Sequence, residues 1–476
     1  METPTQRLHR VTSYAAGGDW EAPPDDPLAL TGYTPSDTDT VPWFSKRYDE
    51  SLPRVELPRD LPATPASAID VLRGVDIPPA ALDLAQLGRV LYLCAGIVRT
   101  AQRDWGALYF RAAGSAGARF PIELYVAVPD GSPLPAGVHW YHPHDHALVT
   151  IGPPPGGEAP AIVSTGIPWR TGWRYRERGY RHIYWDSGTM LSQLLAAARS
   201  AGIAAELYTR FPDAAVTELV GADGVHEWPV AVVGFGGTPS LTPTGAAAAG
   251  DVDHDPHELP LDTQAQRAGD VDELGEPWQP GTPVDVPVTA SPPVEQVVLR
   301  RSSQRRMDRT RGLSRDVAVT ALGVALRGID LPHFVVVHDV AGIEPGVYRW
   351  PDLDTPRRTG DLRDELGRIA LGQGLAHDAA FVVIGAADVG ALDDRGYREA
   401  QLAAGLVEGR LHLSAYALGA SASGMTFLDS EVPALLGEEL DTLLFTCVGV
   451  PAYASKTGGL PGMPVEIATV VPRLRD

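Results

Sequence analysis

The sequence predicts an α+β protein built from two copies of one kind of domain, joined by an acidic linker. Stretches of the first half have counterparts in the same order in the second half, as expected for an internal duplication. Between the halves, residues 237–292 are rich in Pro, Gly, Ala, Thr and Asp and lack a sustained apolar period, which indicates a flexible linker. A chain of 476 residues also exceeds what one hydrophobic core usually supports.

The duplication rests on three pairs of stretches. They are "LPAGVHWYHP" with "IEPGVYRWPD", "MLSQLLAAARSAGI" with "LVEGRLHLSAYALGA", and "FPDAAVTELVGADGVHEWPVAVVGFG" with "FLDSEVPALLGEELDTLLFTCVGVP". The pairing predicts a first domain over residues 61–236 and a second domain over residues 293–476. Residues 1–60, which are rich in Pro, Asp and Trp, are expected to form an extended arm.

Each predicted element follows from its apolar spacing. Residues 81–100 repeat Leu and Val every three or four positions, which predicts a helix. Residues 122–128 and 137–142 are β-rich and are separated by the turn residues of "PDGSPLPAG". An amphipathic helix is expected over 189–203, and a short buried strand over 228–236. The second half repeats this order, with helices over 316–328 and 399–419 and strands over 333–340, 346–350 and 442–450.

Composition excludes several classes of function. The net charge of −21 argues against binding to nucleic acid or to an anionic membrane surface. Cys94 and Cys447 both lie in apolar runs, so neither a zinc ribbon nor a disulfide scaffold is expected. No apolar run reaches the length of a membrane span, and the first residues lack an apolar signal core. A cytoplasmic protein is the expectation.

A cationic loop opens the second half. The stretch "RRSSQRRMDR", from Arg300 to Arg309, contains five arginines, and four of them flank a Ser-Ser pair. Arginine forms bidentate, charge-assisted hydrogen bonds to phosphate, and serine hydroxyls complete such a shell. The loop therefore has the composition of a phosphate-binding cradle, although a solvated basic turn before a helix has the same composition.

Several stretches together resemble the nitroreductase-like flavoproteins. They are the Arg-x-Ser-x-Arg pattern in the cationic loop, "RAAGSAGARFPIELYV" before a strand, and "WRTGWRYRERGYRHIYWDSGTMLSQLLAAA" before a long helix. The likeness covers about residues 60–236 and 294–465, and it is greatest to the SagB/McbC-type dehydrogenases, which act on azoline rings in ribosomally made peptides. This resemblance implies a central, mostly antiparallel sheet flanked by helices in each half. The two halves would form a pseudo-dimer within one chain, and a homodimer is the alternative.

The resemblance also implies one flavin mononucleotide (FMN) per chain, held between the halves. The first half lacks the Arg-Ser loop, because "LPATPASAIDVL" stands in its place, and the second half lacks the Ser-Gly loop. Each half would therefore supply what the other lacks. The residues implied to bind FMN are Gly114, Ser115, Ala116 and Gly117 in the first half, and Arg301, Ser302, Ser303, Arg305, Gly424, Met425, Thr426 and Lys456 in the second.

Tyr175 is the main catalytic candidate. The resemblance places it at the tyrosine of a Lys-Tyr pair that transfers a proton in the azoline dehydrogenases. Arg174 stands where the family has lysine, and because arginine does not act as a base near neutral pH, it would position the substrate instead. The alternative is that Tyr175 is a packed aromatic residue and that the arginines around it pair with acidic residues.

Three functions remain open from the sequence. The first is an FMN-dependent dehydrogenase that oxidises a peptide-derived substrate, such as an azoline ring to an azole, with other enzymes of a peptide-modifying complex as partners. The second is an NAD(P)H-dependent reductase of nitro or quinone compounds, and the third is a flavin-less docking subunit. A metal site is not expected at the four histidines of "HWYHPHDHAL", which fall in a predicted hairpin turn, nor at "DVDHDPHE", which reads as an acidic spacer.

Overall fold

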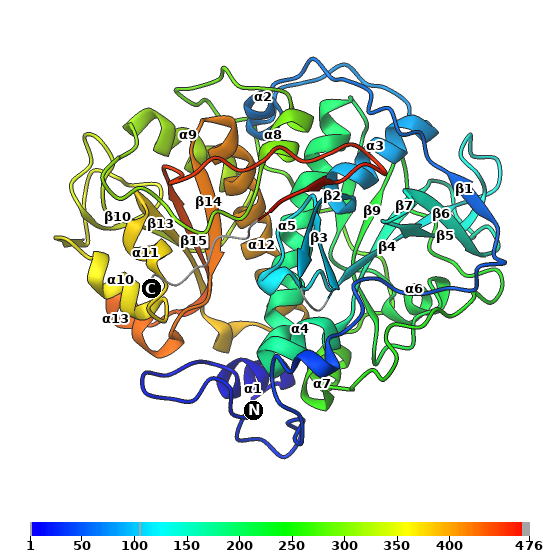
Figure 1. Cartoon of the computed structure of the whole chain (residues 1–476), viewed down its shortest axis with the longest axis horizontal. Helices are drawn as coiled ribbons and strands as arrows, with labels where there is room; N and C mark the ends of the chain where they lie inside the picture. The colour runs from blue at the N-terminus through cyan, green and yellow to red at the C-terminus, as the bar shows by residue number, and fades with distance from the viewer. Residues whose placement is uncertain (1, 104–105, 469–476) are drawn as a thin grey trace.

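The computed structural model describes residues 2–103 and 106–468 (Figure 1). Two sheets lie on opposite sides of a central pair of long helices, α5 (Gly179–Ser200) and α12 (Asp394–Ala417). Helix α5 packs against strands of the first sheet, α12 packs against strands of the second sheet, and the two helices pack against each other. The two halves of the chain therefore meet along a helix–helix interface at the centre of the molecule.

The first sheet is antiparallel throughout and has the order β1-β6-β5-β4-β7-β9-β8. Its strands are β1 (Arg54–Glu56), β4 (Ile122–Val128), β5 (Gly137–His142), β6 (Ala147–Gly152), β7 (Ala161–Gly166), β8 (Glu206–Tyr208) and β9 (Trp228–Gly234). Strand β4 is buried along its whole length. Its alternate side chains enter two different hydrophobic clusters, one shared with the long helices and one beneath α6 (Asp213–Leu219).

The second sheet repeats the order of the first. It runs β12-β11-β10-β13-β15-β14, which corresponds position by position to β6-β5-β4-β7-β9-β8, and it is also antiparallel. Its strands are β10 (His333–Val337), β11 (Gly346–Arg349), β12 (Arg358–Thr359), β13 (Phe381–Ala387), β14 (Ser421–Met425) and β15 (Asp441–Gly449). The equal order agrees with the repeated sequence stretches.

A small third sheet links the ends of the two halves. Strand β2 (Ile97–Arg103) pairs with β3 (Gly106–Arg111) of the first half and with β16 (Val465–Glu466) of the second half. The C-terminal segment crosses from the second half to reach it, as the red trace in Figure 1 shows. The predicted helix over 81–100 therefore ends earlier, as α3 (Leu84–Ala95), because residues from Ile97 onward are the strand β2.

Small residues allow the central helices to approach closely. A Cβ atom on Gly188 of α5 would lie 2.4 Å from the carbonyl oxygen of Leu402, and one on Gly405 of α12 would lie 2.4 Å from that of Trp185. At this distance only glycine fits. The indole of Trp185 donates a hydrogen bond of 2.6 Å to Gln401 Oε1 across the same interface.

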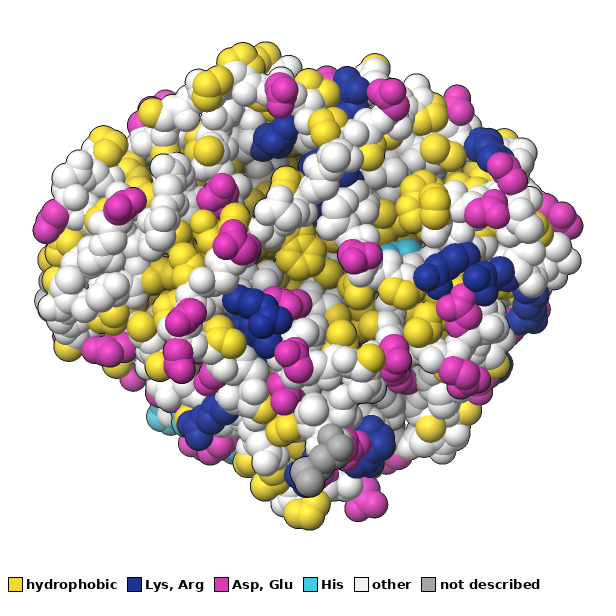
Figure 2. All heavy atoms as spheres, turned by 180° about the vertical axis from the view of Figure 1, so that it is seen from behind, with side chains coloured by type: hydrophobic (Ala, Val, Ile, Leu, Met, Phe, Trp, Pro, Cys, Tyr) yellow, Lys and Arg dark blue, Asp and Glu magenta, His cyan; other side chains and the backbone are white. Residues whose placement is uncertain are grey.

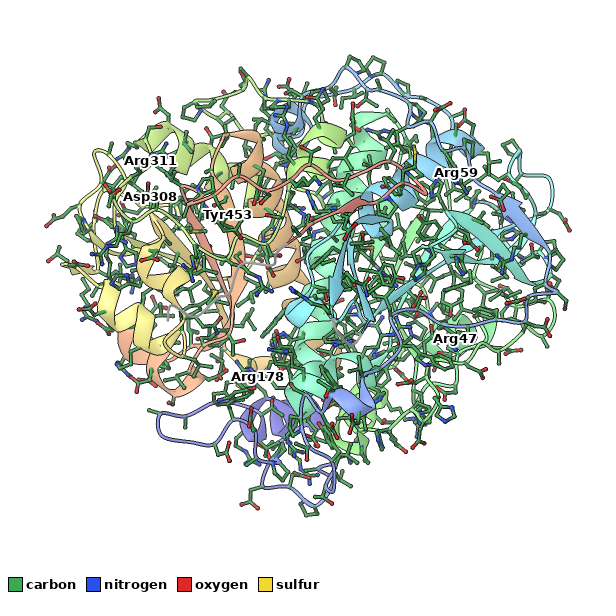
Figure 3. The ribbon with its side chains drawn as sticks, in the orientation of Figure 1. Arg47, Arg59, Arg178, Asp308, Arg311 and Tyr453 are labelled. Atoms are coloured by element: carbon green, nitrogen blue, oxygen red, sulfur yellow. The ribbon has the colours of Figure 1, made fainter. Side chains whose placement is uncertain are left out.

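The N-terminal arm is anchored to both halves. It contains a helix, α1 (Pro4–Val11), in addition to β1, and so is less extended than the sequence predicts. Arg178 and Arg181, at the start of α5, both donate to the carboxylate of Asp429 and to backbone carbonyls of α1 and the residue after it. Figure 3 shows Arg178 where the arm meets the long helices. The two guanidinium groups hold the pKa of Asp429 at about 2 despite its burial.

The tract over residues 237–292 differs from the flexible linker expected there. It contains α7 (Pro260–Ala268), which packs against α1 and α12. Leu261 and Ala265, one helical turn apart, are buried, because the tract carries a short apolar stripe within its acidic composition. Arg395 and Arg398 of α12 both form salt bridges with Asp213 of α6. Arg398 also forms a salt bridge with Asp270, which belongs to this tract. The tract is therefore part of the folded body.

The remaining helices complete both halves. They are α2 (Ala68–Arg73), α4 (Pro168–Tyr175), α8 (Val294–Arg300), α9 (Arg315–Ala325), α10 (Arg363–Ile369), α11 (Gly374–Asp378) and α13 (Val432–Leu436). Short 3-10 turns are η1 (Thr38–Thr40), η2 (Ala116–Ala118), η3 (Arg176–Arg178), η4 (Val389–Ala391) and η5 (Asp429–Glu431). Within the described ranges, no helix combines the length and apolarity that crossing a membrane requires. Acidic side chains are scattered over the face in Figure 2 rather than gathered in one patch.

Candidate active site

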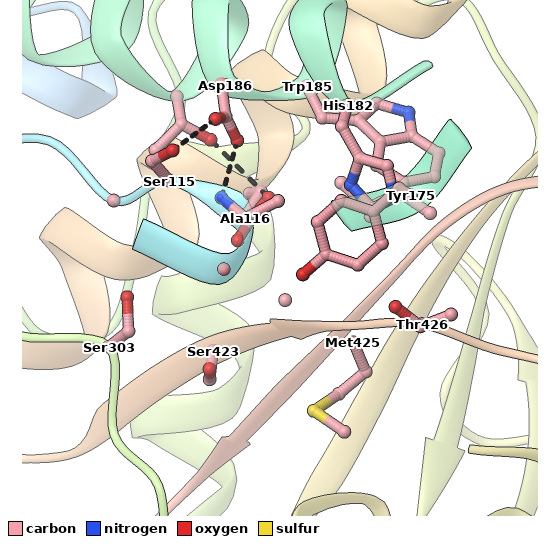
Figure 4. A pocket seen from close by; sticks show the side chains of 16 residues that line it. Ser115, Ala116, Tyr175, His182, Trp185, Asp186, Ser303, Ser423, Met425 and Thr426 are labelled. Carbon is pink, nitrogen blue, oxygen red and sulfur yellow. Dashed lines mark hydrogen bonds between the residues drawn. The ribbon is translucent and has the colours of Figure 1, made fainter. Parts of the chain in front are cut away.

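A pocket opens where the two halves meet (Figure 4). It encloses about 500 Å³ of empty space, including solvent at its mouth. Its walls come from the loop between β3 and β4, from α4 and α5, from the cationic loop after α8, and from α12, β14 and β15. The lining residues are Gly114, Ser115, Ala116, Gly117, Tyr175, His182, Trp185, Asp186, Thr189, Ser303, Glu408, Ser423, Gly424, Met425, Thr426 and Leu444.

The structure brings together most of the residues that the sequence singles out, although they are distant along the chain. Those that line the pocket are Gly114, Ser115, Ala116, Gly117, Tyr175, Ser303, Gly424, Met425 and Thr426. Those outside its lining are Arg174, Arg301, Ser302, Arg305 and Lys456. Both halves of the chain therefore contribute to one pocket.

The loop from Gly114 to Gly117 is held by a carboxyl group on α5. The hydroxyl of Ser115 donates to Asp186 Oδ2 at 2.5 Å, and the backbone N–H of Ala116 donates to Asp186 Oδ1 at 2.9 Å (Figure 4). Gly117 has a φ of +59°, a left-handed conformation that favours glycine. A Cβ there would lie 2.9 Å from the hydroxyl of Tyr175, so the glycine lets that hydroxyl reach the loop.

Asp186 is a buried acid in the wall of the pocket. Burial is the main cause that raises its pKa to about 8, and the nearby Glu408 raises it further. The hydrogen bonds from Ser115 and Ala116 act in the opposite direction. Near neutral pH the neutral carboxylic acid is thus the favoured form. Asp186 also lines a second, mainly apolar pocket behind the first, with about 280 Å³ of empty space.

Tyr175 lies on an aromatic stack. Its ring is 4.2 Å from the ring of His182, centroid to centroid, and the two planes are 22° apart. Trp185 meets the other side of His182 edge-on, at 4.6 Å. His182 is buried, and neither of its ring nitrogens has a hydrogen-bond partner among the described residues. Burial and, after it, the charges of Arg178 and Arg181 hold the pKa of His182 well below its usual value, so the ring is neutral.

Two buried guanidinium groups, those of Arg301 and Arg99, lie near the Gly114–Gly117 loop. Arg301 donates from Nε at 3.0 Å and from Nη2 at 2.7 Å to the carbonyl oxygen of Ala112. A Cβ on Gly114 would lie 3.3 Å from Arg301 Nη1 and 3.4 Å from Ser303 Oγ. Arg99 of β2 donates to two carbonyl oxygens, each at 2.6 Å. Neither arginine has a carboxylate within 4.0 Å in the described part of the chain.

These two groups form a cationic region that draws on both halves. Burial and, after it, the charge of Arg99 lower the pKa of Arg301 to about 10. Such a shift is expected where two cations are desolvated together, and an anion bound beside them would relieve it. Arg99 could not be singled out from the sequence, because it lies within an apolar segment that carries no recognisable motif.

The other residues that the sequence predicts to bind the phosphate, Ser302, Arg305 and Lys456, lie around this region. The hydroxyl of Ser302 lies 3.0 Å from that of Tyr416 and forms a short hydrogen bond with that of Ser455. The backbone N–H of Arg305 donates to the hydroxyl of Tyr453 at 3.2 Å. Lys456 donates from Nζ to the carbonyl oxygen of Glu466 at 2.8 Å, and its own carbonyl accepts from Arg99. Lys456 thus points toward β16 in this structure.

Most arginines around Tyr175 have structural roles. Arg170 binds Glu123 at 2.5 Å beneath the first sheet, and Arg176 donates to three carbonyl oxygens of the N-terminal arm. Arg178 and Arg181 bind Asp429, as described above. Arg174 differs, because its side chain is exposed and makes no hydrogen bond or ion pair to a residue in the described ranges.

Sequence reasoning did not find Asp186, His182 or Glu408. All three lie on long helices, where their spacing shows only which face is buried. His182 and Asp186 are four residues apart on α5, so they share the face that meets the pocket. The position of that face relative to β14 depends on the tertiary packing, which the sequence pattern does not reveal.

Comparisons with known proteins agree with this fold. The nitroreductase family model matches residues 146–237. A protein named as a nitroreductase of Methanocaldococcus jannaschii is 26% identical over 170 residues, which cover 33% of this chain and 81% of that protein. A chain of the Escherichia coli microcin synthetase complex, solved with truncated pro-MccB17 bound, is 20% identical over 40% of this chain and 79% of its own. Its TM-score of 0.29 is too low to support an argument.

The likeness in structure extends over nearly the whole chain. A crystal structure of a nitroreductase from Anabaena variabilis superposes with a TM-score of 0.71 at 21% identity, covering 95% of this chain and 100% of that one. At this identity the likeness concerns the fold alone. Together, the two findings show that the chain has the nitroreductase-like α+β fold and that residues 146–237 match the nitroreductase family model.

Proposed function

We propose that the pocket binds one FMN between the two halves and that the protein is an FMN-dependent oxidoreductase. The observation that carries this proposal is the meeting of the Gly114–Gly117 loop, Ser303 and the Gly424–Thr426 segment in one pocket. The halves, residues 61–236 and 293–476, are in this proposal products of a tandem duplication, which their equal strand order supports. Each half then contributes the segment that the other lacks.

The residues present fit a phosphorylated flavin. Arg301, with Arg99 beside it, offers a desolvated cationic region next to Gly114 and Ser303, as a phosphate group requires. In the lining of the pocket, Ser423 Oγ and the ring nitrogens of His182 are buried without partners among the described residues. Buried polar atoms in a pocket wall are suited to a ligand with polar ring edges. At Gly114, Gly117 and Gly424 the backbone itself lines the pocket, because no side chain covers it.

When bound, FMN supplies the centre that accepts or donates a hydride. Tyr175 would exchange a proton with the substrate, because its hydroxyl reaches the pocket beside Gly117. The stack of Tyr175 on His182 fixes the orientation of the phenol ring. The neutral side chain of Asp186 would hold the pocket loop in place through Ser115 and Ala116.

The substrate that we propose is a peptide-derived ring, such as an azoline that is oxidised to an azole. The support for it is the resemblance of the sequence to the SagB/McbC-type dehydrogenases. Reduction of nitro or quinone compounds by NAD(P)H is the alternative for the same pocket. Anaerobic mixing with NADPH separates the two: rapid bleaching of the flavin favours the reductase, whereas bleaching by an azoline peptide but not by NADPH favours the dehydrogenase.

A single substitution tests the role of Tyr175. Tyr175→Phe should retain FMN and lose turnover by ~10²–10⁴-fold, the usual contribution of a general acid–base group. Tyr180→Phe is the matched control, because that hydroxyl donates to Gln266 at 3.1 Å, outside the pocket lining. Steady-state rates measured with equal flavin content provide the test. Equal rates for wild type and Tyr175→Phe would show that another group moves the proton.

A further inference from the structure

Two guanidinium groups beside the pocket form no salt bridge in the described part of the chain, although the charge of Asp253 acts on one of them, Arg119. Arg119 follows the Gly114–Gly117 loop, and Arg174 is the residue before Tyr175 in α4. Neither side chain forms a hydrogen bond or ion pair with any residue of 2–103 or 106–468. Their neighbours Arg170 and Arg178 each bind a carboxylate. The contrast is informative in a chain with 60 acidic residues, because acidic partners are abundant.

Both groups lie next to the pocket loop. A Cβ built on Gly117, which lines the pocket, would be 2.7 Å from Arg174 Cδ and 3.3 Å from Arg174 Nε. The guanidinium carbon of Arg174 lies 5.9 Å from the ring centroid of Tyr175, which also lines the pocket. That of Arg119 lies 4.6 Å over the ring of Trp173 on the same helix. Both cations therefore lie against α4, the helix that carries the proposed catalytic tyrosine.

The two charges repel each other. Burial is the main cause that lowers the pKa of Arg119 to about 10, and the charges of Arg174 and then Arg170 lower it further. The Nε atom of Arg119 is buried without a partner among the described residues. An anion placed between the guanidinium groups would accept charge-assisted hydrogen bonds and remove the repulsion.

We propose that Arg119 and Arg174 bind an anionic group, a carboxylate or a phosphate, on the molecule that enters the pocket. The inference rests on the proposed function only in taking this pocket as the substrate site. A carboxylate would belong to the oxidised or reduced substrate, such as the free end or an acidic side chain of a peptide. A phosphate would belong to a nicotinamide dinucleotide, either as the diphosphate of NADH and NADPH or as the 2′-phosphate of NADPH. The same cation pair serves either source, and the experiment distinguishes them.

The test uses benzoate and its uncharged analogue benzamide as probes. The full-length, flavin-loaded protein is titrated with each probe, and the change in flavin absorption is followed in the wild type and in Arg119→Gln and Arg174→Gln. We expect the Kd of benzoate to rise about tenfold or more in each variant, as loss of a charge-assisted contact predicts, with no change for benzamide. The same variants are titrated with NADPH and NADH.

The matched control is Arg47→Gln. The guanidinium of Arg47 also lies over a tryptophan ring, Trp43, at 3.6 Å, but it is placed beside the first sheet and away from the central helices (Figure 3). Weaker binding of benzoate in both test variants but not in Arg47→Gln supports a carboxylate source. A loss for NADPH alone supports its 2′-phosphate as the source, a loss for both dinucleotides supports their shared diphosphate, and benzoate is unaffected in either case. Unchanged binding of both anions, or an equal loss in Arg47→Gln, would overturn the inference.

If the proposed flavin binding is wrong, the same variants still test the anion site. If the protein takes up no flavin, calorimetric titration of the flavin-free protein with benzoate replaces the absorption signal. Binding that weakens in Arg119→Gln and Arg174→Gln would then retain the anion site while rejecting the flavin proposal. Absence of binding in the wild type would reject the anion site as well.

Discussion

Arg301 is a buried cation whose side-chain hydrogen bonds, among the described residues, reach only a carbonyl oxygen and a histidine ring. If a phosphate completes its surroundings, Arg301→Ala should give a folded protein with weak flavin binding. The expected loss is ~1.5–3 kcal/mol, or roughly ten- to hundredfold in affinity. Fluorescence titration with FMN measures it.

Arg410→Ala is the matched control for Arg301→Ala. Arg410 is also buried, its pKa is likewise lowered to about 10 by burial, and it donates to carbonyl oxygens at the end of α9 rather than toward the pocket. Its removal should lower stability and leave the affinity for FMN unchanged. Equal FMN affinity in wild type and Arg301→Ala would disprove the proposal that Arg301 binds the phosphate of FMN.

The raised pKa of Asp186 predicts how the stability of the protein depends on pH. Its pKa is raised from 3.8 to about 8, so the folded state binds a proton that the unfolded state releases. This contribution to stability is complete below about pH 4 and is lost as the pH rises toward 8, at up to ~1.4 kcal/mol per pH unit. Asp186→Asn removes this dependence. Urea midpoints at pH 5 and pH 8 should therefore fall more in the wild type than in the variant, and parallel changes would contradict the assignment.

The sequence identified the loop residues of the site and Tyr175 at the end of α4, and missed those on the long helices α5 and α12. The composition of the cationic loop around Ser303 can be recognised without knowledge of the packing, whereas Gly114–Gly117 and Gly424–Thr426 were indicated by the resemblance to nitroreductase-like flavoproteins. His182 and Asp186 lie within a regular amphipathic helix, where polar residues at buried positions are recognisable only once the neighbouring elements are known. Arg99 was missed for a similar reason, since its role depends on a contact across the two halves.

At the level of elements, the crossing of α5 and α12 makes the sharpest prediction. Gly188→Ala places a Cβ 2.4 Å from one backbone atom and 2.5 Å from another, both in α12. The helices must separate, which should destabilise the fold by ~1–3 kcal/mol and open the pocket that they line. The free energy of unfolding in urea and the flavin content report the two effects.

Gly323→Ala in α9 is the control for Gly188→Ala. Its nearest neighbour would be Val286 Cγ1 at 3.4 Å, an ordinary contact. Alanine is a better helix former than glycine by ~1 kcal/mol, so this variant should be as stable as the wild type or more stable. If both variants behave alike, close approach of the central helices is not what requires glycine at position 188.

Periodicity predicted the elements that carry their own apolar pattern. The hairpin of β4 and β5 occupies the expected stretches, and the long helices cover most of theirs, although α5 begins at Gly179 rather than at 189 and α12 at Asp394 rather than at 399. Periodicity failed where pairing is non-local. Strand β16 is two residues long and pairs with β2 from the other half, and α7 has too few apolar residues to stand out from its acidic surroundings. Their conformation comes from tertiary contacts.

At the level of the whole molecule, the two halves are interlocked rather than merely adjacent. The C-terminal segment reaches β2 of the first half, the N-terminal arm binds Asp429 and Asp394 of the second half, and one hydrophobic cluster includes residues of both central helices. This arrangement fixes the relative positions of the pocket walls. It also explains why a site with walls from both halves can be formed within one chain.

The ratio of FMN to protein tests the central claim most directly. The pocket is lined by the Gly114–Gly117 loop of the first half and by Ser303 of the cationic loop of the second half. Neither half has both loops in its sequence, so a second site of the same kind is not expected. The full-length chain, purified and saturated with FMN, should therefore contain one FMN per chain, measured from the absorbance of the released flavin against protein determined by amino-acid analysis. Two FMN per chain, or none, would contradict the account.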